Sequence, residues 1–414
     1  MAQKKIVIIG AGPAGMMAAI RAGQLHKDVA LLEKKSTLGN KLLLSGKGRC
    51  NLTNACDLEV FLKRFSHNGQ FLRDAFKKFF NKELMDFFES RGLRLKTERQ
   101  GRVFPVTDRS SSILEVLKKE LGKNRVNLFF KSEAASISVK DGSVKGVVFC
   151  DGRSIPADSV ILATGGVSYA FTGSTGDGFK MAQWLGHTVT PLKPGLVPLK
   201  AKDKFIKDLE GLTLKNIRIK FSVGKKEIVS EVGELLFTGT GVSGPLVLTL
   251  SGEIFDWLED SKEVNVEIDL KPGLTREQLG ARLLREFKSG SRKTVRNILK
   301  GLLPQRLIDC FIRLAKINND TQGSQVSRKD REKIISFLKG FRLSISGALP
   351  IEEAMVTRGG VSLKDIDPRT MESRKVKGLY FCGELIDIDA DTGGFNLQAA
   401  FSTGYLAGES AALS

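Results

Sequence analysis

The chain has 414 residues, of which 41% are hydrophobic, and a formal net charge of +19 at pH 7. This length suffices for two or three domains, and the sequence lacks an apolar run long enough to cross a bilayer. The first apolar run breaks after four residues into glycines, which argues against a signal peptide. These features predict a cytoplasmic protein without a membrane partner. The excess of positive charge favours a polyanionic partner or substrate, although a generally lysine-rich surface would give the same total.

The cysteines and histidines argue against a metal centre. The five cysteines are scattered along the chain, and the three histidines lie far apart in the sequence. An odd number of cysteines without metal-ligand spacing fits a reducing compartment and neither a disulfide framework nor a zinc site.

A βαβ unit is predicted at the start of the chain. Residues 6–9 are β-branched and apolar, as in a buried parallel strand. Glycines 10, 12 and 15 follow with G-x-G-x-x-G spacing, residues 16–25 have a helical composition, and residues 29–32 form a second strand that ends in an acid. This complete context indicates a dinucleotide site, whereas a glycine turn alone could be purely structural.

Each part of this unit has a physical role at a dinucleotide. Gly10 allows a tight turn, Gly12 allows the backbone to approach a pyrophosphate, and Gly15 allows close packing of helix on strand. The helix N-terminus offers N–H groups and positive potential to the phosphates. Glu33 is suited to accept hydrogen bonds from a ribose hydroxyl. The motif does not by itself distinguish FAD from NAD.

A basic, glycine-rich loop follows at residues 45–54, SGKGRCNLTN. Its N–H groups and Arg49 could approach phosphates or a flavin ring, although a surface loop has the same composition. Further on, residues 70–80 and 82–91 predict two amphipathic helices with phenylalanines in the core. A small antiparallel meander is expected from three strands, at residues 127–130, 134–139 and 144–149.

The middle of the chain changes character at prolines 191, 194 and 198. Residues 196–270 are mostly strand-like with two-faced alternation, which predicts a small barrel or sandwich. They contain a second G-x-G-x-x-G at residues 239–244. On spacing alone this could be an NAD(P)H site, but the short preceding run and Pro245 at a helix start favour a tight turn.

Residues 271–340 predict four basic helices, at residues 275–287, 292–302, 304–315 and 327–338. The segment holds 17 Lys and Arg against six Asp and Glu, an excess of 11. Several basic side chains recur at spacings of three and four, so they share helix faces, and only Glu286 provides an acid between residues 282 and 300. This density favours polyanion binding, with a solvated helix face as the alternative.

The last strand and helix indicate which dinucleotide is bound. Residues 377–382 predict a buried strand that ends in Gly383 and Glu384, and Gly393 and Gly394 precede a helix of small residues. This order is similar to that of the flavin-binding half of two-dinucleotide-fold flavoproteins. Such a helix directs positive potential toward the flavin edge that gains negative charge on reduction. FAD is therefore the expected cofactor.

Seven motifs occur in order from one end of the chain to the other: GAGPAG at 10–15, SGKGRCNLTN at 45–54, GRVFP at 101–105, ATGG at 163–166, TGSTGDG at 172–178, LFTGTGVSGP at 236–245 and LYFCGELIDIDADTGGFNLQAAFSTG at 379–404. Together they resemble the YhiN/BaiN-like flavoproteins, also called the aminoacetone-oxidase-like family. The resemblance implies an α/β fold with a Rossmann-type two-dinucleotide-fold FAD domain at residues 1–190 and 348–414. It also implies an inserted β-barrel substrate domain at 191–270 and 341–347, and an inserted basic helical bundle at 271–340.

The resemblance also assigns cofactor-binding roles to positions in these motifs and beside them. The matching residues are Gly10, Gly12, Ala14, Gly15, Glu33, Lys34, Lys41, Ser45, Gly46, Gly48, Arg49, Asn51, Thr164, Gly165, Gly383, Glu384, Gly394, Phe395, Asn396 and Leu397.

Members of this family are linked to aminoacetone oxidation, to reduction of a conjugated bile-acid enone and to reduction of a uridine in ribosomal RNA. The last two reactions transfer a hydride from flavin N5 to the β carbon of an enone-like system. The positive charge favours RNA, so the expected function is FAD-dependent formation of dihydrouridine in ribosomal RNA, with NAD(P)H as a transient electron donor. The alternatives are a small-molecule oxidase or enone reductase with an aminoacetone-like or steroid-like substrate, and a non-catalytic flavin-containing RNA-binding protein.

Two further sets of residues complete the prediction. The basic insert is expected to contact RNA through Arg285, Arg292, Lys293, Arg296 and Lys300. The reaction also needs a proton at the α carbon. Cys50 is the first candidate, because the adjacent Arg49 is expected to lower the pKa of its thiol. A lower pKa leaves less thiol to donate, a buried packing cysteine is the alternative, and Arg102 and Tyr169 are competing donors.

Overall fold

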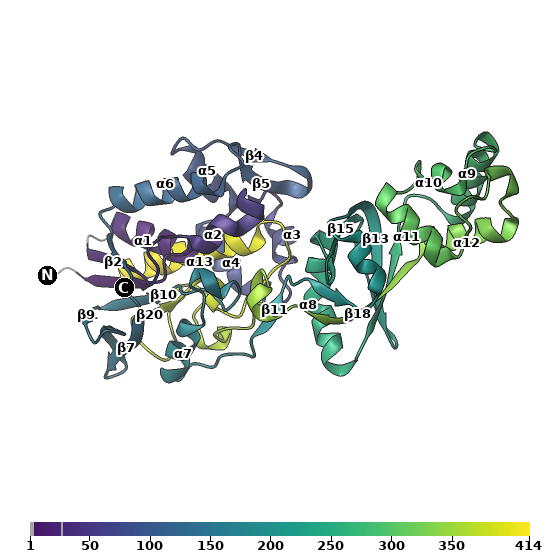
Figure 1. Cartoon of the computed structure of the whole chain (residues 1–414). Helices are drawn as coiled ribbons and strands as arrows, with labels where there is room; N and C mark the ends of the chain where they lie inside the picture. The colour runs from purple at the N-terminus through teal and green to yellow at the C-terminus, as the bar shows by residue number, and fades with distance from the viewer. Residues whose placement is uncertain (1–3, 26–27) are drawn as a thin grey trace. The chain divides into compact units, whose positions relative to one another are not determined.

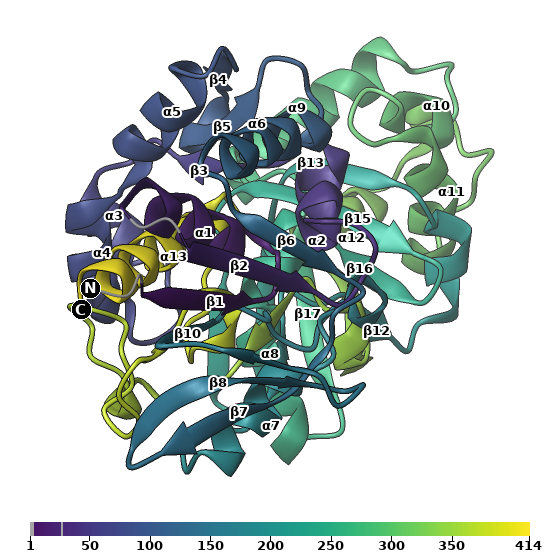
Figure 2. The same ribbon diagram turned by 90° about the vertical axis from the view of Figure 1, so that its left-hand side faces the viewer.

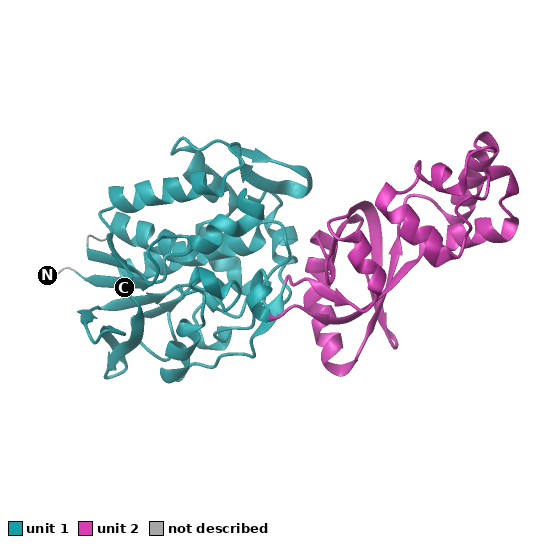
Figure 3. Ribbon diagram, viewed as in Figure 1, with its two compact units in different colours: residues 1–195, 351–414 teal, residues 196–350 magenta. Residues whose placement is uncertain are grey.

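The computed structural model describes residues 4–25 and 28–414. The chain forms two compact units, one made of residues 1–195 and 351–414 and the other of residues 196–350 (Figure 3). Each unit contains a hydrophobic core of its own. The second unit is therefore inserted in the sequence of the first. The finer division into three domains stays a prediction.

Within the described residues, the first unit contains a parallel sheet of five strands in the order β20-β10-β1-β2-β6. Central β1 pairs with β10 through Ile6 and Ser159, and with β2 through Lys5 and Asp28. The carboxyl ends of these parallel strands meet at one edge, which is where open α/β sheets bind ligands. The strands are β1 (Lys5–Ile9), β2 (Asp28–Glu33), β6 (Asn127–Phe130), β10 (Ser159–Leu162) and β20 (Leu379–Phe381).

Helix α13 (Phe395–Leu413), at the C-terminal end, packs on α1 (Pro13–Leu25), as Figures 1 and 2 show. A Cβ on Gly404 would lie 2.2 Å from the carbonyl oxygen of Ala14, and a Cβ on Gly408 would lie 2.3 Å from that of Ala18. The two helix backbones therefore touch at positions that only glycine tolerates. Among the described residues, we find no helix of the length and apolar character that a membrane span requires.

Smaller elements complete the first unit. The helices are α2 (Asn40–Leu44), α3 (Leu58–Leu62), α4 (Arg73–Lys78), α5 (Asn81–Glu89), α6 (Ser110–Lys123) and α7 (Asp177–Trp184). Three antiparallel sheets contain β3 (Thr53–Asn54), β5 (Arg102–Pro105) and β4 (Leu95–Thr97); β7 (Ala134–Lys140), β8 (Ser143–Phe149) and β9 (Ser154–Pro156); and β11 (Lys193–Gly195) and β19 (Val356–Arg358).

Two local predictions have different outcomes. The phenylalanines of α4 and α5 are core residues as expected, since Phe76, Phe87 and Phe88 are buried. The predicted meander is wrong in one strand, because residues 127–130 form β6, at the edge of the parallel sheet. The third strand of the meander is β9, which pairs with β8. Short alternating strands look alike in sequence, and pairing partners far along the chain decide between them.

The second unit contains a closed antiparallel barrel in its described residues. Its strands follow one another around the barrel in the order β13-β15-β16-β12-β18-β17, β17 pairs back onto β13, and β14 extends from β13. This confirms the barrel expected from two-faced strands. The strands are β12 (Leu199–Ala201), β13 (Thr213–Val223), β14 (Lys226–Val229), β15 (Gly233–Thr238), β16 (Gly241–Ser243), β17 (Val264–Asp269) and β18 (Phe341–Ala348).

The second glycine motif lies in this barrel, in a hairpin between β15 and β16. Thr238 pairs antiparallel with Gly241, and helix α8 (Pro245–Asp260) begins after Gly244. A Cβ on Gly241 would lie 2.0 Å from the carbonyl oxygen of Leu199 in β12. Close strand packing therefore explains this glycine, and the segment differs from the parallel strand-turn-helix of a dinucleotide motif.

The predicted basic helices lie in the chain between β17 and β18. Their apolar faces share a core with the barrel strands. The helices are α9 (Arg276–Ser289), α10 (Val295–Leu299), α11 (Gln305–Ala315) and α12 (Arg328–Lys339).

The contact between α13 and α1 can be tested with Gly404→Ala. The added methyl group would overlap the carbonyl of Ala14, and overpacking of a well-packed core costs about 1–3 kcal/mol of unfolding free energy. Urea unfolding should show this loss. Gly122→Ala in α6 is the control: its Cβ meets no atom within 4 Å, and alanine there should be neutral or stabilise the helix by about 0.5–1 kcal/mol. Unchanged or greater stability of Gly404→Ala would contradict the close contact.

Candidate functional site

The turn between β1 and α1 combines packed and open glycines. A Cβ on Gly10 would lie 2.6 Å from the carbonyl oxygen of Ala163, and a Cβ on Gly15 would lie 1.9 Å from that of Gly10. Gly12 differs, because its Cβ would meet no atom within 4 Å. The backbone at Gly12 therefore borders open space beside the N-terminus of α1, where unpaired N–H groups favour an anion.

Two polar groups lie at the carboxyl ends of the neighbouring strands. Glu33 ends β2, and its carboxylate accepts hydrogen bonds from the N–H of Ala11 at 3.1 Å and of Lys35 at 2.8 Å. The hydroxyl of Thr164, after β10, is buried and has no hydrogen-bond partner among the described residues. A buried hydroxyl without a protein partner is suited to a bound ligand. The open space at Gly12, the carboxylate and this hydroxyl together fit a dinucleotide such as FAD.

The 45–54 loop and the start of α13 lie side by side, although they are distant in sequence. The Asn54 amide donates to the carbonyl of Gly393 at 3.2 Å, and the Thr53 hydroxyl donates to Gln398 at 2.6 Å. With its amide oriented to suit its neighbours, Asn51 accepts from the N–H of Gly394 at 3.1 Å. The structure therefore joins the basic glycine-rich loop to the helix N-terminus that the sequence associates with a flavin.

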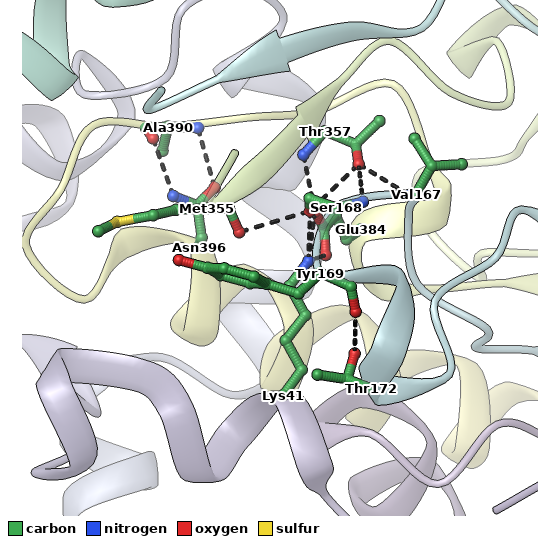
Figure 4. A network of polar contacts seen from close by, with 10 residues as sticks. All are labelled: Lys41, Val167, Ser168, Tyr169, Thr172, Met355, Thr357, Glu384, Ala390 and Asn396. Atoms are coloured by element: carbon green, nitrogen blue, oxygen red, sulfur yellow. Dashed lines mark hydrogen bonds and ion pairs between the residues drawn. The ribbon is translucent and has the colours of Figure 1, made fainter. Parts of the chain in front are cut away.

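Lys41, Ser168 and Glu384 form a polar network between these parts (Figure 4). Lys41 Nζ lies 2.7 Å from Glu384 Oε2 and donates to Ser168 Oγ at 2.6 Å. Ser168 in turn donates to Glu384 Oε1 at 3.0 Å. The three side chains come from α2, from the segment after β10 and from the end of β20. Both oxygens of the strand-end acid are thus hydrogen-bonded within the protein.

Several other predicted cofactor residues already have protein partners. The Asn396 side chain bonds both the N–H and the carbonyl of Ala390, at 2.9 and 2.8 Å, and so closes the loop before α13 (Figure 4). Phe395 is buried and its ring centroid lies 4.7 Å from that of Phe61. Their roles toward a cofactor stay predictions.

The two basic candidates Arg49 and Lys34 also form ion pairs. The Arg49 guanidinium pairs with Glu98 and Asp108 and lies 4.1 Å from the centroid of the Phe104 ring. The Lys34 ammonium pairs with Asp177. Both contacts cross long stretches of sequence, so neighbouring residues gave no sign of them.

The expected effect of Arg49 on Cys50 is wrong. The Cys50 side chain is fully buried, and burial raises the pKa of its thiol to about 12. The thiol is therefore an inert, protonated group at neutral pH, since the adjacent guanidinium is directed to its two carboxylates. The buried packing cysteine, which the sequence left open, matches this environment.

The other two proton-donor candidates differ in their surroundings. Tyr169 follows Ser168 directly and is half-buried, and burial raises the pKa of its hydroxyl. The Arg102 side chain donates to the carbonyl of Arg99 at 3.2 Å. In the described structure, Tyr169 is thus the candidate beside the polar network of Lys41.

Sequence reasoning missed two features near the site. Thr357 is buried, and its N–H donates to Glu384 Oε1 at 2.7 Å. Asp389, in the loop between β20 and α13, accepts from the Ser66 hydroxyl at 2.7 Å, and burial raises the pKa of its carboxyl. Asp389 lies inside the C-terminal motif, so its position could have marked it, but its burial depends on packing that the sequence does not display.

Comparisons with known proteins agree with this geometry. The family model described as HI0933-like protein Rossmann domain matches residues 4–410. A 3-dehydro-bile acid delta(4,6)-reductase of Clostridium scindens is 35% identical over 413 residues, which are 99% of each chain. A ribosomal RNA dihydrouridine synthase of Haemophilus influenzae is 31% identical over 404 residues, which are 96% of each chain.

Solved structures share the fold at low sequence identity. A 3-ketosteroid delta1-dehydrogenase from Sterolibacterium denitrificans is 12% identical, with a TM-score of 0.52 over 99% of both chains. The family match spans nearly the whole chain and includes the glycine turn, the strand-end acids and the C-terminal helix described above. The chain belongs to the HI0933-like family of FAD-dependent Rossmann oxidoreductases.

Proposed function

We propose that this protein is a reductase of an activated C=C bond, with a uridine in ribosomal RNA as its substrate and NAD(P)H as its electron donor. Family membership supports flavin chemistry. The names of the two relatives support reduction, since one is a delta(4,6)-reductase and the other a dihydrouridine synthase. Dihydrouridine differs from uridine by one hydrogen on each of two ring carbons. Because that C=C bond is conjugated with a carbonyl group, it resembles an enone.

FAD is the cofactor in this proposal. Gly12 and the N-terminus of α1 would hold its pyrophosphate, and Glu33 a ribose hydroxyl. Gly394 and the first residues of α13, together with the 45–54 loop, would hold the flavin. When bound and reduced by NAD(P)H, FAD would supply the hydride for the β carbon of the substrate. The protein must then provide a proton for the α carbon.

Tyr169 and Asp389 are more accessible than Cys50 as donors of this proton. Cys50 is enclosed by protein, so its thiol is not accessible to a substrate. Tyr169 is partly exposed beside Ser168. Asp389 is partly exposed too, and its raised carboxyl pKa keeps it protonated to higher pH than an ordinary aspartate.

One observation carries the choice of RNA: the helical insert presents exposed cations that form no ion pair with the residues that the structure describes. Arg285, Arg292, Lys293 and Lys300 are exposed, and the described residues provide an ion pair to none of them. The backbone under Lys293 is fixed, because its carbonyl accepts from the N–H of Gly323 at 2.9 Å. Unpaired cations on a fixed backbone are suited to phosphate contacts, which supply most of the affinity of a protein for nucleic acid.

Arg296 differs from the other four predicted RNA contacts. Its guanidinium forms a two-point ion pair with Asp309 of α11, at 2.7 and 3.0 Å. The sequence between residues 282 and 300 offers only Glu286 as an acid and so predicts an unpaired Arg296; this prediction is wrong, because the acid comes from another helix. We assign the main phosphate contacts to the four unpaired cations.

A small-molecule enone reductase is the second candidate. The relative with the higher identity of the two reported, 35% over 99% of each chain, is a bile acid reductase. Such a substrate needs apolar contacts and gains little from the basic insert, so the two candidates differ in how strongly salt weakens substrate binding.

The cofactor assignment predicts the behaviour of Gly12→Val. The valine side chain would fill the space over the turn, so the purified variant should lack the flavin absorbance that wild type shows. The fold should survive, because the new side chain meets no protein atom within 4 Å at its Cβ. Thermal unfolding of flavin-free protein measures this. Gly122→Val, at an equally open helix position, should keep its flavin, and full flavin content in Gly12→Val would refute the placement of the phosphates.

The RNA assignment predicts the effect of reversing charge at Arg285, Arg292 and Lys293. The triple glutamate variant should bind ribosomal RNA fragments more weakly, and the log–log slope of affinity against salt should fall by about one for each lost phosphate contact. The control reverses the exposed Lys118, Lys119 and Lys123 of α6, which changes net charge equally on the other unit. Equal RNA affinity and salt slope in wild type and triple variant would favour the small-molecule candidate.

Mass spectrometry of ribosomal RNA tests the reaction itself. A strain without this protein should lack one dihydrouridine of the wild-type ribosomal RNA. At that position it should keep a uridine, which has two hydrogens fewer. The modification should return with the wild-type gene but not with Gly12→Val. If no ribosomal RNA nucleotide changes, the substrate is not this RNA, and steroid-like enones become the substrates to assay with NAD(P)H.

A further inference from the structure

We propose that Thr357 is a positioning residue of the cofactor site, whose hydroxyl and N–H hold Glu384 and the 167–168 segment so that Lys41 has one fixed orientation toward bound FAD. The inference depends on the proposed function, because it assumes that FAD binds beside Lys41 and Glu384. Thr357 lies outside every motif singled out in the sequence.

Thr357 is buried and forms hydrogen bonds to several residues. The residue is 1% exposed, and its N–H donates to Glu384 Oε1 at 2.7 Å. Its hydroxyl oxygen accepts from the N–H groups of Val167 at 2.9 Å and Ser168 at 3.2 Å (Figure 4). The hydroxyl proton is directed to Ser168 Oγ at 3.4 Å. One threonine thus links its own strand to Glu384, Val167 and Ser168.

These contacts determine the orientation of Lys41 through its two partners. The Lys41 ammonium is bonded to Glu384 and Ser168, and Thr357 contacts both of these residues. Glu384 receives donors from Lys41, Ser168 and Thr357, so its carboxylate cannot turn without breaking a charge-assisted hydrogen bond. Lys41 is therefore bonded to a carboxylate whose own orientation is fixed by Ser168 and Thr357.

The surrounding backbone is fitted to this hydroxyl. A Cβ on Gly166 would lie 2.2 Å from Thr357 Oγ1, so only glycine leaves room for it. The strand of Thr357, β19, pairs with β11 through Pro194, and the N–H of Tyr169 donates to the carbonyl of Glu352 at 2.9 Å. The segment at 352–357 therefore lies along the segment at 166–169. Residues 352–357 lie where the chain returns to the first unit, after residue 350.

A packing role alone would not need the hydroxyl. Valine has nearly the same shape as threonine and keeps the backbone N–H to Glu384, but it offers no acceptor to Val167 and Ser168. Serine keeps the acceptor and loses only a methyl group. The pair Thr357→Val and Thr357→Ser therefore separates hydrogen bonding from packing.

The test measures FAD binding to flavin-free protein, the visible spectrum of the bound flavin, and thermal unfolding without FAD. For Thr357→Val we expect an FAD dissociation constant raised about tenfold or more, the size expected when a hydrogen bond that fixes a charged group is lost. The flavin absorption bands should also shift. Thr357→Ser should restore the wild-type spectrum and affinity. Thr190→Val is the control, since its hydroxyl bonds Gly360 and touches neither Lys41 nor Glu384.

Ser168→Ala provides a second route if Thr357→Val unfolds. It removes one of the two hydrogen-bond partners of Lys41, which keeps its ion pair with Glu384, so it should shift the flavin bands in the same direction, and wild-type bands in this variant would count against the positioning role. Where Thr357→Val folds, the double variant should lose less FAD affinity than the sum of the two. Wild-type affinity and spectrum in Thr357→Val, or equal losses in the valine and serine variants, would overturn the positioning role. If the wild-type protein itself binds no FAD, the proposed function fails first, and this result is distinguishable because it needs no variant.

Discussion

Backbone contact among β1, α1 and α13 is the constraint on which the first unit depends. Gly15 brings α1 against the turn at Gly10, because a Cβ on Gly15 would lie 1.9 Å from the carbonyl oxygen of Gly10. Gly404 brings α13 against α1, because a Cβ on Gly404 would lie 2.2 Å from the carbonyl oxygen of Ala14. Such close approach of the backbones leaves no room for a side chain at Gly15 or Gly404. The N-termini of α1 and α13, which come from opposite ends of the chain, are therefore fixed relative to each other. A ligand that is long enough to need both ends, as a dinucleotide is, finds two positive helix ends already in position.

The cofactor site and the helical insert differ in how their basic side chains are paired. In the first unit, Lys41 pairs with Glu384, Lys34 with Asp177, and Arg49 with two acids. Such pairs fix side chains in one orientation and add little long-range field. On the helical insert, the unpaired Arg292 and Lys293 keep their field, which extends about one Debye length, roughly 10 Å at 0.1 M salt, into the solvent. The pairing in the first unit suits the geometry of a cofactor, and the unpaired charge suits attraction of an anion.

Local sequence predicts what is determined locally. The glycine turn, the acid at Glu33 and the helical starts follow from spacing within about 30 residues, and the structure has them in the expected order. The inserted barrel could also be predicted, because alternation along each strand does not depend on partners. What fails depends on partners: residues 127–130 join the parallel sheet, Asp309 neutralises Arg296 from a different helix, and Arg49 pairs with acids rather than acting on the Cys50 thiol. Thr357 belongs to the same class, since its contacts reach residues about 30 and 190 positions away.

The difference between the flavin site and the basic insert bears on the choice of substrate. A hydride acceptor conjugated with a carbonyl demands the same from the flavin site whether it is part of a steroid or of a nucleobase, so the site common to the family cannot separate the two. Binding energy can. A steroid-sized ligand gains affinity from apolar area removed from water, about 25 cal/mol per Å², which salt does not weaken. A ribosomal RNA gains it from phosphates, and in a segment with 11 more basic than acidic residues a bound polyanion would relieve the repulsion among the cations. In the proposed function, the insert and not the flavin site therefore distinguishes between the substrates.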